Sequence, residues 1–256
     1  MNKNKNLFKR VLIVILIIFI ILIIYKIDKG FYNTERNSLS NKYISFTFDD
    51  GYEDQYINAF PIFKKHEINA TSYIITNLNN LEGYDLMTID QLNDLSKNGW
   101  EIGSHSLTHP YLTRLSFDDI EVELKKSKQA LLNKGFNIRS FSVPYGDYNK
   151  IIKDKSKLYY ESTRTSIWGT NDLKNLDKYE LKSKWIINST SVSEMKSWVD
   201  QLSDGDWLII MIHHVEEDKS KGLYSVSPQD LEEFVNYTSD KNIKIKTISG
   251  VLNEYK

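Results

Sequence analysis

Two adjacent carboxylates, Asp49 and Asp50, follow the apolar stretch YISFTF at residues 43–48 and precede Gly51. Neighbouring residues of a strand point to opposite faces, but a turn at Gly51 can bring both acids to one site. Buried together without a partner, the two charges would be costly. A metal ion would relieve their repulsion and separate their roles, one acid as ligand and the other as base. An ordinary surface turn is the simpler alternative.

A pair of histidines, His105 and His109, follows the strand-like segment WEIGS at residues 100–104. Residues four apart can share one face of a helical turn and bind one cation. Pro110 disfavours helical geometry at His109, so any such turn must be brief. The chain has only five histidines, which favours a metal site here over two unrelated polar loop residues.

A second pair, His213 and His214, follows the continuous apolar run WLIIMI at residues 207–212. Such a run is typical of a strand buried on both faces. If this strand lies parallel to the one before Asp49, a histidine at its end meets the acids at the same edge. The alternative is a core or rim histidine whose ring is satisfied by other partners.

Strand-like and helix-like segments alternate from residue 42 onward, which predicts a parallel sheet covered by helices. The predicted strands are 43–48, 70–76, 100–104, 136–143, 159–165, 183–189, 207–212 and 243–248. The predicted helices are 54–67, 88–99, 116–135, 191–203 and 228–240. Seven to eight such units suit a closed (β/α) barrel, with an open doubly wound sheet as the alternative. We expect one α/β domain over residues 42–256.

The N-terminus predicts a membrane anchor over residues 1–27. Val11–Ile24 is an unbroken apolar run, with four basic residues before it and Lys26 and Lys29 after it. The run is short for a span, but flanking basic side chains can reach the two interfaces. The charge bias places the N-terminus inside and the remainder outside the cytoplasm. Residues 28–41 are polar and aperiodic, as in a stalk. A cleaved signal peptide, giving a secreted protein, is the alternative.

The composition excludes several classes of function. The chain has no cysteine, so disulfides, thiolate metal sites and a cysteine nucleophile are absent. A net charge of −1 gives no reason to expect nucleic acid as a partner. The 16 tyrosines and 5 tryptophans include rings that can line a sugar-binding groove as well as a core.

The motifs TFDDG, HSLTH, PYG and a strand ending in histidine occur in that order at residues 47–51, 105–109, 144–146 and 207–213. Together they resemble the polysaccharide deacetylases, also called NodB-homology proteins or carbohydrate esterase family four, over about residues 42–250. The PYGDYN sequence resembles the poly-N-acetylglucosamine deacetylase branch. The resemblance implies a distorted (β/α) barrel and a divalent metal, most often zinc, with cobalt or nickel as alternatives.

The resemblance also implies roles for individual residues. Asp49 matches the general base, and His213 matches the general acid, with His214 as its rival. The backbone N–H of Tyr145 matches part of the oxyanion hole. The residues that match the three metal ligands are Asp50, His105 and His109.

One position departs from the family pattern R-x-F-R-x-P-Y. Ser142 stands where an arginine usually orients the catalytic Asp. Arg164, in the predicted strand at 159–165, is a hypothetical replacement. The tryptophans considered for the groove wall are Trp168, Trp185 and Trp207.

The expected function is removal of N-acetyl groups from an extracellular or cell-wall N-acetylglucosamine polymer. A second possibility is an O-acetyl esterase acting on acetylated glycans. A third is a membrane-tethered glycan-binding module without activity, for which Ser142 is the supporting feature.

Overall fold

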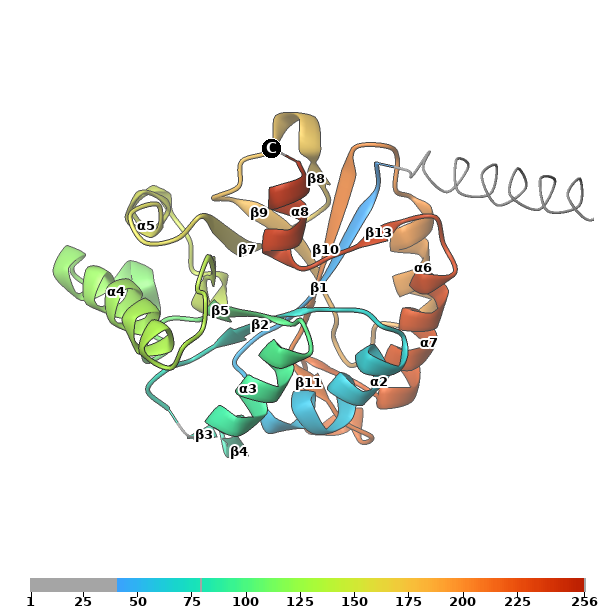
Figure 1. Cartoon of the computed structure of the whole chain (residues 1–256), viewed down its shortest axis with the longest axis horizontal. Helices are drawn as coiled ribbons and strands as arrows, with labels where there is room; N and C mark the ends of the chain where they lie inside the picture. The colour runs from blue at the N-terminus through green and yellow to red at the C-terminus, as the bar shows by residue number, and fades with distance from the viewer. Residues whose placement is uncertain (1–40, 79, 256) are drawn as a thin grey trace, which may run out of the picture. The chain divides into compact units, whose positions relative to one another are not determined.

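The computed structural model describes residues 41–78 and 80–255. Seven parallel strands close into a barrel, because the last of them, β10, pairs along its length with β1. In barrel order they are β1 (Tyr43–Phe48), β2 (Thr71–Ile74), β5 (Glu101–Ser104), β6 (Ser140–Ser142), β7 (Ser162–Trp168), β9 (Leu181–Trp185) and β10 (Asp206–Ile212). The closed barrel predicted from the strand–helix alternation is confirmed, and the open doubly wound sheet is not formed (Figure 1).

Helices cover the outside of the barrel (Figure 1). They are α2 (Phe60–Lys65), α3 (Ile89–Lys97), α4 (Phe117–Asn133), α5 (Lys150–Ser156), α6 (Val192–Asp200) and α7 (Pro228–Ser239). Thr88 begins α3 with a reciprocal capping box to Gln91, and the Ser116 hydroxyl accepts from the Asp119 N–H at the start of α4. Both predicted helix starts are therefore confirmed, because each hydroxyl satisfies an N–H that has no partner within the helix.

Two predicted elements differ in character in the structure, whereas β2, β6, β7 and β9 differ from their predicted ranges only in their bounds. The helix expected over 54–67 begins as a π-helical turn, η1 (Gln55–Ala59), and continues as α2 with Pro61 in its first turn. The strand expected over 243–248 shrinks to β13 (Lys244–Ile245), and the chain then enters α8 (Ile248–Glu254). The alternation of Ile and Lys fits a strand, but Thr247 caps a helix by accepting from the Gly250 N–H at 3.1 Å.

Alternate residues of the strands pack into two separate cores. Ile44, Phe46 and Phe48 of β1 face the outer helices, whereas Tyr43 joins a smaller cluster with residues of β10 and α8. Trp207 belongs to this inner cluster, fully buried, and its indole N–H donates to the Ser45 hydroxyl at 2.9 Å. The prediction that Trp207 could line a sugar groove is therefore wrong. A residue at the start of a strand lies at the opposite end from the predicted site.

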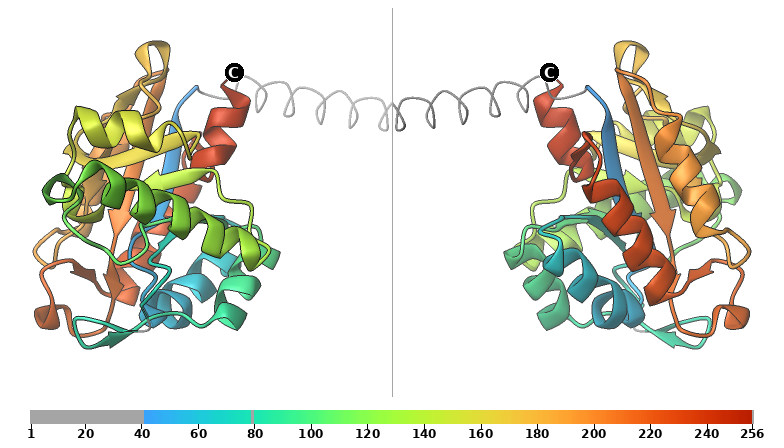
Figure 2. Two further views of the ribbon diagram at one scale, coloured as in Figure 1. Left: turned by 90° about the vertical axis from the view of Figure 1, so that its left-hand side faces the viewer. Right: turned by 90° about the vertical axis from the view of Figure 1, so that its right-hand side faces the viewer.

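The two ends of the barrel carry different elements (Figure 2). Helix α8 closes the end where the strands begin. At the other end lie the hairpin β3 (Asn80–Leu81) and β4 (Tyr84–Asp85), and the pair β11 (His214–Val215) and β12 (Ser225–Val226). The remaining short elements are the antiparallel strand β8 (Asn171–Asp172) and the 3₁₀ turns η2 (Leu112–Arg114), η3 (Pro144–Gly146), η4 (Leu173–Asn175) and η5 (Lys219–Lys221).

The predicted anchor at 1–27, and the predicted stalk except for residue 41, lie outside the described residues. Within 41–78 and 80–255, none of the helices has the length and apolar character needed to cross a membrane.

Candidate active site

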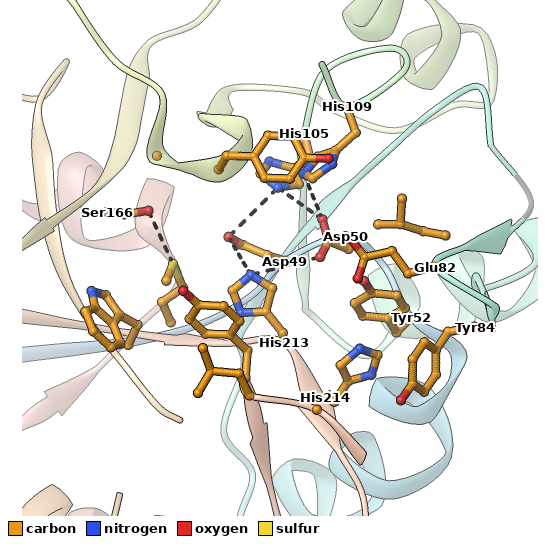
Figure 3. Close-up of a pocket in the computed structure, with 18 of the residues that line it drawn as sticks. Asp49, Asp50, Tyr52, Glu82, Tyr84, His105, His109, Ser166, His213 and His214 are labelled. Carbon is orange, nitrogen blue, oxygen red and sulfur yellow. Dashed lines mark hydrogen bonds and ion pairs between the residues drawn. The ribbon is translucent and has the colours of Figure 1, made fainter. Parts of the chain in front are cut away.

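All six predicted site residues line one cavity at the carboxyl ends of the strands (Figure 3). Asp49 and Asp50 follow β1, His105 and His109 follow β5, and His213 follows β10; Tyr145 lies in η3 after β6. The cavity measures about 740 Å³. Parallel strands bring their carboxyl ends to a single face, so segments distant in sequence meet there.

The turn after β1 directs both acids into this cavity. Asp50 has a φ of 69° and Gly51 a φ of 81°, both in the left-handed region. A side chain at Gly51 would also place its Cβ 2.9 Å from Ile74 Cδ1. The acids are only 2% and 4% exposed. An ordinary surface turn is therefore excluded, and Gly51 acts as the sequence predicted.

The loop of His105 and His109 adopts a different conformation from the brief helical turn considered from the sequence. Ser106 and His109 have φ values of 65° and 58°, and the Ser106 hydroxyl accepts from the His109 N–H at 3.0 Å. The buried carboxylate of Glu123, on α4, accepts from the N–H groups of Leu107 and Thr108, each at 2.9 Å. Side-chain hydrogen bonds thus replace the helical ones.

Sequence reasoning missed Glu123. The available signal was a carboxylate within the apolar stripe of α4, whose other buried members are Ile120, Leu124, Ser127 and Leu131. A buried acid needs hydrogen-bond donors, and here those donors belong to the histidine loop.

The donor atoms of Asp50, His105 and His109 fit a divalent metal ion. Both histidine Nε2 atoms approach Asp50 Oδ1, at 3.3 and 3.2 Å. Two ligands of a tetrahedral zinc ion are separated by about 3.3 Å when each bond is roughly 2.0–2.1 Å. Asp50 Oδ1 is buried and has no hydrogen-bond partner among the described residues. Three donors therefore converge on a point where a cation would satisfy them.

The pKa shifts of His109 and Asp50 agree with such a site. Burial by itself lowers the pKa of His105, but Asp49 and Asp50 raise it above its ordinary value, so a metal ion would have to displace a proton there. His105 Nδ1 lies 2.8 Å from the carbonyl oxygen of Ser142, so it carries the proton and leaves Nε2 facing Asp50. Burial, together with the charge of His105, lowers the pKa of His109 to about 4. Burial by itself raises the pKa of Asp50, but the neighbouring histidines, His105 foremost, lower it below its usual value. Neutral imidazole and ionised carboxylate are the forms that bind metal.

Arg164 supplies the cation that Ser142 does not. The Arg164 guanidinium, fully buried, pairs with both carboxylate oxygens of Asp49 and donates to the Ser142 hydroxyl at 2.5 Å. Burial raises the pKa of Asp49, but Arg164 first and then His105 and His213 bring it below its ordinary value. The hypothesis that Arg164 compensates for Ser142 is confirmed, because β7 and β6 are neighbours and Arg164 pairs in register with Ser142.

Replacing Arg164 by Met should lower the free energy of unfolding by about 3–5 kcal/mol, since it leaves a buried carboxylate without its partner. Asp49 with its lowered pKa stabilises the native protein above the unfolded pKa, and this contribution disappears as the pH falls through the native pKa. In the Arg164→Met variant, burial is the dominant effect on Asp49 and raises the pKa of this carboxyl. The cost of burying its unpaired charge therefore disappears as Asp49 becomes protonated at lower pH. Denaturant unfolding of the two metal-free proteins should therefore show a difference in the free energy of unfolding that becomes smaller between neutral pH and about pH 4.

Arg139→Met is the control for this substitution. Arg139 pairs with Glu161 at 2.6 Å near the surface, where an ion pair contributes about 0–1 kcal/mol. A pH-independent difference for Arg164→Met, equal to that of the control, would contradict the coupling to Asp49.

The structure distinguishes the two consecutive histidines. His213 Nε2 lies 4.0 Å from Asp49 Oδ2 and 4.0 Å from Asp50 Oδ2. His214 instead directs Nδ1 to Asp54 Oδ2 at 2.7 Å, and its ring packs against those of Tyr52 and Tyr84 (Figure 3). His213 therefore faces the reaction centre, whereas the Nδ1 atom of His214 is occupied by a hydrogen bond. Asp54, His214 and Glu216 also have convergent donor atoms, and two of the three already form a hydrogen bond with each other.

Aromatic rings border the cavity on two sides. Tyr145, at a φ of 56°, stacks on Tyr111 with ring centroids 4.1 Å apart and planes 9° apart. On the other side Trp185 lines the cavity with Tyr224. Trp168 packs edge-on against Trp185, with centroids 5.1 Å apart, but does not itself line the cavity. Of the three tryptophans considered, only Trp185 is therefore part of the wall.

The family model for polysaccharide deacetylases matches residues 36–161. The chain is 30% identical over 131 residues to the putative polysaccharide deacetylase YxkH of Bacillus subtilis, which covers 50% of this chain and 46% of that protein. It is 29% identical over 182 residues to the poly-beta-1,6-N-acetyl-D-glucosamine N-deacetylase of Staphylococcus epidermidis, covering 64% and 61% of the two chains. The chain thus spans less than two thirds of the length of either relative.

A solved structure shows the same fold. The deacetylase PplD of Streptococcus pyogenes, in complex with acetate, superposes with a TM-score of 0.55 at 28% identity, over 60% of this chain and 68% of that one. With the motifs and the barrel, these matches show that the chain contains a polysaccharide deacetylase domain.

Proposed function

We propose that this protein is a metal-dependent hydrolase that removes N-acetyl groups from an N-acetylglucosamine-containing polysaccharide outside the cell. The observation that carries the proposal is the arrangement around Asp49. Arg164 holds this buried carboxylate ionised, three metal-type donors lie beside it, and His213 faces it. The pairing with Arg164 also removes the feature that favoured a non-catalytic module.

The proposed roles follow from these positions. A divalent ion held by Asp50, His105 and His109, most simply zinc with cobalt or nickel as alternatives, would polarise the acetyl carbonyl and lower the pKa of bound water. Asp49 accepts the proton of the attacking water, since its lowered pKa keeps it ionised at neutral pH. His213 gives a proton to the departing sugar nitrogen. The backbone N–H of Tyr145 stabilises the oxyanion.

The cavity supports a carbohydrate as substrate. Its lining includes six aromatic side chains of the types that combine an apolar ring with a polar group, namely Tyr52, Tyr84, Tyr111, Tyr145, Trp185 and Tyr224. No lysine or arginine is among the described residues that line it, so an anionic substrate has no evident partner there. The relative that acts on poly-beta-1,6-N-acetyl-D-glucosamine supports the amide as the bond that is cleaved.

The decisive experiment is an acetate-release assay on poly-N-acetylglucosamine, wall glycan, chitin oligomers and acetylxylan, with and without a chelator. We expect release from an N-acetylglucosamine polymer, loss with chelator and recovery on adding a divalent metal. Release from acetylxylan alone would support the second candidate, an O-acetyl esterase. Chelator-insensitive release would contradict metal dependence.

Tyr111→Ala should weaken binding of a polymer without slowing turnover. The Tyr111 side chain is 40% exposed, lines the cavity and packs on Tyr145, so its loss should remove contact with the polymer rather than with the acetyl group. By analogy with stacking on exposed rings, we expect KM for a long oligomer to rise about 5–10-fold, or roughly 1–1.5 kcal/mol. Kinetics on oligomers and on the monosaccharide would check this, with Tyr255→Ala as the control on a distant exposed tyrosine.

We further propose that residues 1–27 anchor the protein in the membrane and place the domain outside the cytoplasm. The support is the apolar run Val11–Ile24 with its excess of basic residues on the N-terminal side. External protease added to intact cells from which any wall barrier has been removed should digest the domain, leaving a cytoplasmic control protein intact. A domain protected until the cells are lysed would contradict this placement.

A further inference from the structure

Gln55 links the backbones of the two residues proposed to transfer protons. Its side chain is fully buried, and Nε2 donates to the carbonyl oxygens of Asp49, at 2.5 Å, and His213, at 2.8 Å. Among the described residues, Gln55 Oε1 has no hydrogen-bond partner. The two donated bonds are therefore the polar contacts that this amide makes with its surroundings.

These bonds occur where the strand ladder ends. The pairing of β1 with β10 stops at Phe48 and Ile212, and the last backbone bond runs from the Asp49 N–H to the Ile212 oxygen at 2.9 Å. Beyond it the left-handed Asp50 turns the chain away from β10. Gln55 bridges Asp49 and His213 at the position where the next backbone hydrogen bond between the two strands would lie, and where their backbone groups are too far apart to form it.

The same helical segment holds the residues after His213. Asp54 Oδ1 accepts from the Val215 N–H at 3.1 Å, and Asn58 Nδ2 donates to the Val215 oxygen at 2.7 Å. Asp54 and Asn58 are four residues apart and so share a helix face. The turn that begins at Gln55 is π-helical, a geometry that often occurs at functional sites.

We infer that Gln55 is a positioning residue that sets the placement of Asp49 relative to His213. This inference rests on the proposed function for its kinetic consequence. The base acts on the attacking water and the acid on the departing nitrogen, so both must approach one acyl centre from fixed positions. A displacement of about 1 Å in such an arrangement can cost roughly 100-fold in rate.

Gln55→Met tests the inference because it keeps the length of the side chain and removes both donors. We expect kcat to fall about 10–100-fold, with KM and bound metal close to wild type.

Gln55→Glu gives a second readout. An ionised carboxylate would repel the two carbonyl oxygens, whereas the neutral acid can donate one bond. Its activity, divided by that of wild type at the same pH, should therefore rise as the pH falls.

Asn171→Leu is the matched control. Asn171 is also a buried amide that bridges two strand carbonyls, donating to Lys182 at 2.9 Å and Trp207 at 3.2 Å, but at the start of β10. It should lower stability while leaving kcat unchanged. A wild-type kcat in Gln55→Met, or an equal loss of kcat in the two variants, would overturn the inference.

Hydrogen exchange separates this inference from the proposed function. In Gln55→Met the Asp49 N–H should exchange faster than in wild type, because its bond to Ile212 is no longer supported by the neighbouring bridge. This measurement needs no substrate. Unchanged exchange in Gln55→Met would overturn the inference. Faster exchange in Gln55→Met, together with no acetate release by the wild-type protein, would overturn the proposed function alone.

Discussion

Asp49→Asn is expected to lower kcat for acetate release by a factor of about 10²–10⁴, the contribution typical of a general base. Asn keeps the size of the side chain and an oxygen that can accept from Arg164, but it cannot take a proton from water. Asp49 Oδ2 also lies 4.0 Å from His105 Nε2, whereas Asp50 Oδ1 is within 3.3 Å of both histidines. Bound metal should therefore remain stoichiometric by elemental analysis.

Thermal unfolding of Asp49→Asn is needed as a control, because Arg164 loses a charged partner in the buried site. The comparison is made at a temperature where both proteins are fully folded. Acetate release close to the wild-type rate by a folded, metal-loaded variant would refute the assignment of Asp49 as the base.

Asp50→Asn is expected to lose both metal and activity. Asp50 supplies the only carboxylate of the three convergent donors, and a neutral amide cannot balance the charge of a divalent cation. Removing even an outer-shell partner of a metal ligand costs about 10–100-fold in affinity, and the loss of a charged ligand should exceed this. Elemental analysis after dialysis should show metal well below one equivalent.

The two variants differ in their response to added metal. Excess divalent cation should partly restore acetate release in Asp50→Asn, since the base and the acid are intact. It should not restore release in Asp49→Asn, whose metal is already present. If added metal rescues both variants, the two acids share their roles. If it rescues the Asp49 variant alone, the roles are reversed.

Several features were predictable because local chemistry alone decides them. Apolar strands, capped helices and their alternation come from nearest-neighbour preferences, so the closed barrel and the starts of α3 and α4 were predicted correctly. The turn at Gly51 was predictable for the same reason, since few residues other than glycine adopt positive φ easily. The order of the DDG, HSLTH and PYG motifs identified the family.

Other features depended on residues distant in sequence. Pairing between Asp49 and Arg164, 115 residues apart, requires β7 to lie beside β6 within a closed barrel. The choice of His213 over His214 depended on Asp54, and the shape of the histidine loop on Glu123 in α4. The prediction that Trp207 lines the groove was wrong because Trp207 lies at the start of β10, and this end of the barrel is opposite the cavity.

The sequence by itself therefore determined which chemical groups meet at the carboxyl ends of the strands, because strand periodicity and motif order are local properties. Only the tertiary structure decided how those groups are held. The cation beside Asp49, the partner of His214 and the amide bridge of Gln55 all come from neighbouring elements, and barrel closure sets those neighbours. A buried charge or carbonyl needs a partner, but its identity depends on which distant residue the fold brings within hydrogen-bonding distance.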